Sequence, residues 1–243
     1  MWMKGGSKWM FGEVYRPLGT VVNIVEIMCS SENSSDNLFI GLLRRFLVNT
    51  ALVWPMLGLY LLINHHQPAP TIVVLMPTWV PFAPSFMPVY LGLMLITWLL
   101  PVMIFDRTRF RASLRANLCA WLLVMPWWIL TPTVMSRPPI PEGSWGETYQ
   151  WLWAMDHPYN VMPCAHGVGP VVAAWFVGRE RPSWRWPLAA LLLATLPSIS
   201  LVWQHRPVDI LLGTVAAGVG IAVAEWFYRR DIMLHRSMNP VPA

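Results

Sequence analysis

Two short stretches of the sequence hold residues that could carry covalent chemistry: Asn160 to His166, and His205 to Asp209. Each places a histidine at the rim of an apolar segment, where a polar ring is costly to keep without a partner or a task. Two facing imidazoles can divide the work of a group transfer, one attacking as a nucleophile and the other donating a proton to the leaving group. Asp209 follows His205 by one helical turn, where a carboxylate can hold the second ring nitrogen.

A reading without chemistry stays open for the same residues. Pro207 suits the first position of a helix, which puts Asp209 in the first turn, where a carboxylate complements the helix dipole. His205 would then be a cap and His166 an interfacial polar residue. The coincidence of all three on one side of a membrane favours a functional site.

Groups suited to anions accompany these histidines. Arg137 lies on the same expected side, and its planar guanidinium matches the geometry of a phosphate. The backbone amides of Cys164, Ala165 and His166 are expected to open a helix, and a helix N-terminus is itself an anion site. Arg206 either joins this site or extends to lipid headgroups.

The composition indicates that the elements positioning these residues lie in a membrane. Hydrophobic residues make up 56% of the chain and charged residues 12%, and 16 residues are Trp. This profile is typical of a polytopic membrane protein and excludes an ordinary soluble domain. The net charge of +5 is explained by flanks attracted to anionic lipid, and nothing indicates a nucleic-acid partner.

Because a bilayer core needs about 20 apolar residues per helix, the sequence predicts an all-α bundle of six transmembrane helices. The fourth span is the weakest, since it is short unless it begins near Pro163. Gly213, Gly218 and Gly220 are expected to allow close packing of the last helix. The six predicted spans are Phe46 to Asn64, Phe86 to Phe105, Ala116 to Val134, Gly167 to Gly178, Trp186 to Trp203 and Pro207 to Tyr228.

The basic residues predict the orientation, because cytoplasmic loops retain Lys and Arg. With both termini in the cytoplasm, Arg137 and Arg206 are the basic residues left outside, and both histidines face the outer side. A bacterial inner membrane with a periplasmic site is the assumed location. The residues expected inside are Lys4, Lys8, Arg16, Arg44, Arg45, Arg107, Arg109, Arg111, Arg115, Arg179, Arg181, Arg185, Arg229, Arg230 and Arg236.

Three regions are predicted along the chain: a cytoplasmic or interfacial extension (1–45), the membrane domain (46–230) and a cytoplasmic tail (231–243). No removable signal peptide is expected. The three cysteines fall in different compartments and predict no disulfide framework. No Cys/His spacing suits zinc, and His65 with His66 lacks a third ligand, so no metal is expected.

These residues resemble the type 2 phosphatidic acid phosphatase superfamily, in particular its inositol phosphorylceramide synthase-like branch. Its first motif is represented by Arg137-Pro138, its second by Pro163-Cys164-Ala165-His166, and its third by Ser198, His205 and Asp209. The branch also often has an Asp and an Asn before the second motif, which Asp156 and Asn160 match. The similarity covers about residues 75 to 220, and a proline-rich stretch before the second span adds to it at Pro81, Pro84 and Pro88.

The resemblance implies roles for the matching residues. His205 would be the nucleophile that forms a phosphohistidine, Asp209 its orienting partner, His166 the general acid and Arg137 a phosphate clamp. Further phosphate contacts would come from Cys164, Ala165, Arg206 and Ser198. No metal or organic cofactor is implied.

Several positions depart from the family pattern. Leu130 stands where the first motif has Lys, Cys164 replaces a Ser, Ile199 replaces an Arg, and Trp203 stands where the branch often has Lys. These changes remove phosphate donors and weaken stabilisation of the transferring group.

We therefore expect a membrane enzyme that hydrolyses a lipid phosphate or pyrophosphate through a phosphohistidine on the outer face. Its partners would be its lipid substrate and the surrounding membrane lipids. One alternative is a phosphotransferase that moves a phospho-headgroup to a lipid alcohol. Another is a catalytically silent relative that binds lipid as a membrane subunit. The sequence specifies neither the lipid nor the oligomeric state.

Overall fold

The computed structural model describes residues 38–66 and 72–238, with side chains described up to Arg230. The chain divides into two units, Met1–Asn37 and Leu38–Ala243, and the description concerns the second. Most of the predicted extension (1–45) and the end of the predicted tail (231–243) lie outside the described residues.

The described part of the chain contains four helices that are long and apolar enough to cross a membrane. Many large apolar side chains on their outer surfaces are exposed, among them Leu47, Leu95, Leu122 and Leu211. Such faces are unusual on soluble monomers and fit contact with lipid. The four are α2 (Leu38–His66), α3 (Met87–Leu99) with its flanking 3-10 turns η1 (Pro84–Phe86) and η2 (Leu100–Met103), α4 (Arg107–Leu130) and α9 (Pro207–Met238).

The other two predicted spans form shorter helices. The fourth corresponds to α6 (Val168–Glu180), preceded by the 3-10 turn η3 (Ala165–Gly167). The fifth is divided into α7 (Arg185–Thr195), which follows η4 (Pro182–Trp184), and α8 (Ser198–Leu201). Pro197 lies at the break, where its missing N–H removes a helical hydrogen bond. The structure therefore supports four candidate crossings by length, where the sequence predicted six.

Two predicted boundaries are also moved. Helix α2 begins at Leu38, eight residues before the expected domain start at 46, and α9 continues to Met238 without a break at 230. Arg44 and Arg45, which were expected in the extension before the membrane domain, thus lie within α2. Composition alone marks where a helix becomes apolar, whereas the helix itself continues through its polar ends.

Helix α9 packs closely against its neighbours at two glycines, one facing α4 and the other facing the main chain at Cys164. A methyl group at Gly220 would lie 2.3 Å from the carbonyl oxygen of Ala116 in α4. At Gly213 it would lie 1.9 Å from the carbonyl oxygen of Cys164, next to His166. A methyl at Gly218 would meet nothing within 4 Å. The expectation of close packing is confirmed for two of the three glycines.

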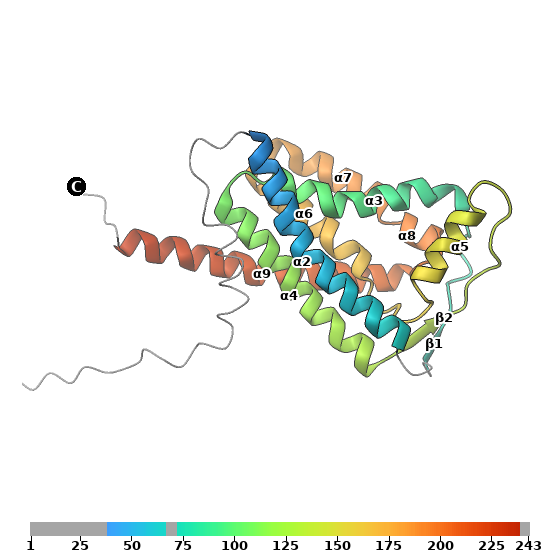
Figure 1. Ribbon diagram of the computed structural model, residues 1–243. Coiled ribbons are helices and arrows are strands. Elements are labelled where there is room, and N and C mark those ends of the chain that lie inside the picture. The colour runs from blue at the N-terminus through green and yellow to red at the C-terminus, as the bar shows by residue number, and fades with distance from the viewer. Residues whose placement is uncertain (1–37, 67–71, 239–243) are drawn as a thin grey trace, which may run out of the picture. The chain divides into compact units, whose positions relative to one another are not determined.

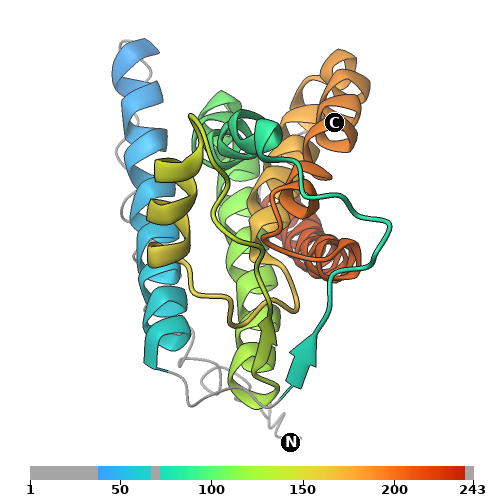
Figure 2. The same ribbon diagram turned by 90° about the vertical axis from the view of Figure 1, so that its right-hand side faces the viewer.

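The expected all-α fold is mostly confirmed, with one small addition. Strands β1 (Ile72–Val74) and β2 (Thr133–Met135) pair in parallel, with Val73 opposite Val134. They lie with α5 (Gly146–Met155) at one end of the bundle, while α9 extends past the opposite end (Figure 1). Figure 2 shows α5 running beside α2. The strands and α5 hold the loops that carry the histidines.

Candidate active site

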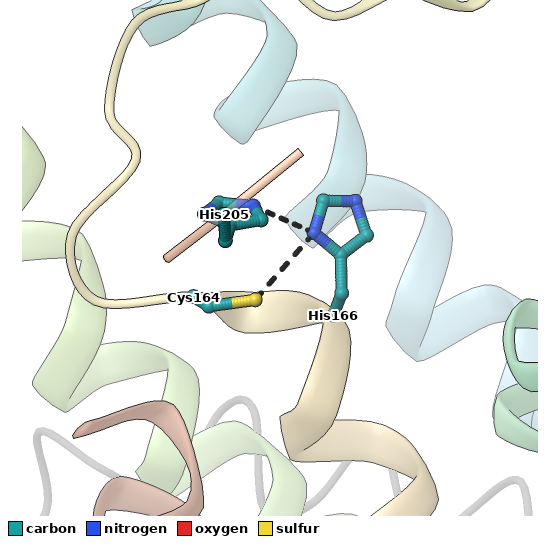
Figure 3. A group of neighbouring side chains, drawn as sticks. All are labelled: Cys164, His166 and His205. Atoms are coloured by element: carbon teal, nitrogen blue, oxygen red, sulfur yellow. Dashed lines mark hydrogen bonds between the residues drawn. The ribbon is translucent and has the colours of Figure 1, made fainter. Parts of the chain in front are cut away.

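The two histidines lie side by side, at the end of the bundle that carries the strands. His166 comes from η3, at the start of α6, and His205 from the loop before α9. The Nδ1 atom of His166 lies 2.9 Å from Nε2 of His205, within hydrogen-bonding distance (Figure 3). Residues 39 positions apart in sequence are thus brought into direct contact.

The hydrogen-bond partners fix the protons on both rings. Nδ1 of His205 lies 2.6 Å from the carbonyl oxygen of Val161, which can only accept a hydrogen bond, so this nitrogen carries the proton. In the neutral ring Nε2 of His205 therefore carries a lone pair, and Nδ1–H of His166 donates a hydrogen bond to it. A lone pair on Nε2 is the form that a nucleophilic histidine requires.

Burial keeps these rings neutral. It lowers the pKa of His205 well below its ordinary value, and the neighbouring His166, Arg137 and Arg206 lower it further. Burial also lowers the pKa of His166, with Arg137 adding to the effect while Asp156 opposes it. Both imidazoles are thus held in the uncharged state at neutral pH.

These lowered pKa values predict that acid destabilises the fold. Below about pH 6.5 the histidines bind protons in the unfolded chain but not in the native state. The free energy of unfolding therefore falls by up to about 1.4 kcal/mol for each ring with each pH unit of acidification. Thermal unfolding in detergent between pH 8 and 5 measures this slope. His205→Asn should flatten this slope. An unchanged slope in His205→Asn would contradict the prediction.

Strand β2 positions the Val161 carbonyl. The Thr133 carbonyl accepts a hydrogen bond from the amide of Asn160 at 2.9 Å, and the Thr133 hydroxyl accepts one from the amide of Val161 at 3.1 Å. On the other side, the Trp128 indole of α4 donates to the carbonyl of Pro163 at 3.0 Å. The loop before η3 is therefore fixed at both ends.

A tight helix end positions His205. The amide of Trp203 donates to the carbonyl of Ser200, and the amide of Gln204 to the carbonyl of Ile199, each at 3.0 Å. This is the Schellman pattern, and Trp203 takes the left-handed conformation with φ of 56°. Glycine usually fills that place, so a bulky side chain here is strained. The turn directs His205 into the bundle, where its exposed fraction is 3%.

Asp209 lies in the first turn of α9, as predicted, but its carboxylate is bound by Arg206 and not by the His205 ring. The Arg206 amide and Nε donate to Oδ2 at 2.9 and 3.0 Å, and Nη2 donates to Oδ1 at 2.7 Å. Asp209 thus caps α9 through the amide three residues before it, and its place in the first turn also complements the helix dipole. The orienting partner of His205 is the Val161 carbonyl instead.

Four other expected phosphate contacts are occupied or indirect. The Ser198 hydroxyl donates to the carbonyl of Thr195, and Arg206 is bound to Asp209. The Cys164 amide donates to the carbonyl of Asp209 at 3.0 Å, so it is not directed at a ligand. Ala165 contributes to the wall of the neighbouring cavity.

Arg137 remains available as a phosphate-binding group. Its side chain is 9% exposed, lies 3.9 Å from Oδ2 of Asp156, and lies over the Trp153 ring. Its Nε has no hydrogen-bond partner among the described residues. Asp156 also accepts a hydrogen bond from Tyr60, and the Gln204 amide can donate to its Oδ2 at 3.0 Å. Arg137 is thus held by a buried carboxylate network with donor capacity left over.

An apolar cavity of about 140 Å³ opens beside the histidines. Most of its wall is apolar or aromatic, and His166 and His205 supply polar groups at the same cavity. It is bordered by residues of α2, α3, α4 and α6, among them Leu57, Met94, Trp121, Trp128 and Gly169. The two histidine rings therefore meet a space suited to hydrocarbon.

Sequence reasoning missed the Val161 carbonyl, the Tyr60 hydroxyl and the Gln204 amide. The first is a main-chain group and leaves no signal in residue types. Tyr60 and Gln204 both interact with Asp156, whose position before the second motif was the available signal. Comparison with known proteins gives no match: no protein-family model, curated protein or solved structure matches this chain.

Proposed function

We propose that this protein is a membrane lipid phosphatase that works through a phosphohistidine on His205. The observation that carries the proposal is the arrangement of the ring nitrogens. Nε2 of His205 carries a lone pair of fixed orientation, and Nδ1 of His166 lies 2.9 Å from it. The type 2 phosphatidic acid phosphatase resemblance assigns the same two roles to these residues.

In the proposed reaction the substrate phosphate enters between the two rings and replaces their hydrogen bond. Nε2 of His205 attacks phosphorus, the bond from phosphorus to the lipid oxygen breaks, and Nδ1–H of His166 protonates that oxygen. Water then attacks the phosphohistidine with His166 as the base, which releases phosphate and restores the His205 lone pair. The Val161 carbonyl accepts from Nδ1–H throughout and stabilises the positive ring.

Arg137 is the proposed phosphate clamp. It lies close enough to both histidines to lower the pKa of each, and its Nε is free of partners among the described residues. A buried guanidinium with an unused donor is well suited to an incoming anion, because charge-assisted hydrogen bonds are strong where water is excluded. Asp156 holds Arg137 in place from the other side.

The substrate is proposed to be a lipid because of the cavity. Its apolar wall accommodates part of a hydrocarbon chain while the phosphate reaches the histidines. Four helices able to cross a membrane surround or adjoin this region. We further propose that α6 and the α7–α8 pair complete six crossings, with both termini in the cytoplasm and the histidines on the outer face; the distribution of arginines supports this orientation.

The direct test is phosphate release from a panel of lipid monophosphates and pyrophosphates by the purified protein in detergent with a metal chelator. We expect release from at least one lipid and none from water-soluble phosphate esters of the same headgroup. Suppression of release by an added lipid alcohol, with formation of a phosphorylated acceptor, would identify a phosphotransferase. The absence of both products for every lipid would overturn the proposal in favour of a silent lipid-binding subunit.

A further inference from the structure

The site contains a third metal-binding side chain that the proposed reaction does not use. Sγ of Cys164 lies 3.7 Å from Nδ1 of His166, and this nitrogen lies 2.9 Å from Nε2 of His205. All three atoms lie within 4.8 Å of one another (Figure 3). We propose that Cys164, His166 and His205 bind a soft divalent cation of the Zn²⁺ type, and that the bound ion blocks phosphoryl transfer.

Two of the three distances between the donor atoms are close to those of a tetrahedral zinc centre, and the third, from Sγ of Cys164 to Nε2 of His205, is within 4.8 Å. Bonds of about 2.3 Å to sulfur and about 2.0 Å to nitrogen place S and N about 3.6 Å apart and two nitrogens about 3.3 Å apart. The observed sulfur–nitrogen distance of 3.7 Å already agrees. Nδ1 of His166 and Nε2 of His205, which lie 2.9 Å apart, need to separate by about 0.4 Å to reach that geometry.

The ring orientations also suit a metal. A metal-binding histidine usually donates its second N–H to a carbonyl or carboxylate, which fixes the free nitrogen as the ligand. The Val161 carbonyl does this for His205 and leaves Nε2 for the ion. His166 would bind through Nδ1, with its ring proton moved to Nε2. Cys164 would bind as thiolate, so each ion bound releases one proton from sulfur to solvent.

The surroundings leave one coordination position open. His166 and His205 line the apolar cavity, so the fourth position faces this space, where a water molecule can complete the shell. The Cys164 side chain is fully buried. The positive charge of nearby Arg137 opposes a cation, but Asp156 lies 3.9 Å from it and offsets this charge.

The blocking effect rests on the proposed function, since it needs His205 to be the nucleophile. An ion bound to Nε2 occupies the lone pair that would attack phosphorus, so binding and reaction exclude each other. Cys164 stands where the family motif has Ser, and a neutral hydroxyl is a poor ligand for this class of ion. The inhibitory site is therefore a property of this chain's cysteine.

The test uses full-length protein in detergent, stripped with chelator and titrated with Zn²⁺ against a chromophoric chelator. We expect one tightly bound ion per chain and a thiolate charge-transfer band when Co²⁺ replaces Zn²⁺. Cys164→Ser and His205→Ala should each weaken binding by more than about tenfold. Matched controls are Cys119→Ser, the other described free cysteine, and His65→Ala, whose ring stacks on His157; both should bind as the wild type does.

The outcomes separate the two proposals. Wild-type protein that binds no zinc, or Cys164→Ser that binds it unchanged, would overturn the metal site even if phosphate release depends on His205. Zinc binding that requires Cys164, in a protein that releases no phosphate from any lipid, would support the site and contradict the phosphatase. Where both hold, Zn²⁺ should inhibit release in the wild type and lose most of its effect in Cys164→Ser, measured against each variant's own metal-free rate.

Discussion

Replacing His205 by alanine is expected to lower phosphate release from a lipid phosphate by at least about 10⁴-fold, because removal of a covalent nucleophile leaves only binding and electrostatic effects. The loss follows from the position of Nε2 of His205, which carries the lone pair that is directed toward His166. Rapid acid-free quenching with labelled substrate, followed by detection of the acid-labile phosphoramidate, measures the intermediate directly. The variant should form none.

His166→Ala is the informative contrast to this variant. It removes the proton donor and leaves the nucleophile, so a substrate with an activated leaving group should still phosphorylate His205. Release from the natural lipid should fall much further than release from the activated one. A phosphorylated protein detected in His205→Ala, or equal losses for both leaving groups in His166→Ala, would contradict the roles assigned to these residues.

Gly213→Ala is expected to have the largest effect on stability. Its methyl group would lie 1.9 Å from the Cys164 carbonyl oxygen, a main-chain atom that cannot move without displacing η3 and His166. Overpacking of this kind typically costs about 1–3 kcal/mol, and a clash with backbone belongs at or above the upper end. Thermal unfolding in detergent should show a lower midpoint, and phosphate release should fall with it.

The same helix provides a matched control. A methyl at Gly218 would meet nothing within 4 Å, so Gly218→Ala should be neutral or gain up to about 1 kcal/mol from helix propensity. Gly220→Ala should resemble Gly213→Ala in stability, because its methyl would lie 2.3 Å from the Ala116 carbonyl oxygen. Equal stability of Gly213→Ala and Gly218→Ala would show that the close approach of α9 to Cys164 is not needed.

The residues that meet in the site were predictable to the extent that residue types carry the signal. Spans placed on either side of His166 and His205 put both rings at the same end of a bundle, and the fold brings them together. The four long helices could likewise be found from runs of apolar residues. Neither result required knowledge of packing.

The sequence did not predict features that depend on which of two neighbouring groups forms a hydrogen bond or on a local break in a helix. Asp209 could bind either His205 or Arg206, and the nearer group, three residues away on the same turn, forms three hydrogen bonds with it. The break of the fifth predicted span at Pro197 is local in the same way, since a hydropathy window averages over it. The position of the Cys164 sulfur beside both histidine rings was not predicted, because it depends on the local turn before η3.

The hydrogen bond from His205 to the Val161 carbonyl affects which mutations the site can accept during evolution. An orienting carboxylate is lost by a single substitution, whereas a carbonyl of the main chain survives replacement of the side chain at 161 by any residue that preserves the local backbone. The mutations that remove this acceptor are therefore those that shift the loop, at Thr133, Trp128 or Gly213. Selection on the orientation of the proposed nucleophile would thereby act on the scaffold around it and not on one titratable residue.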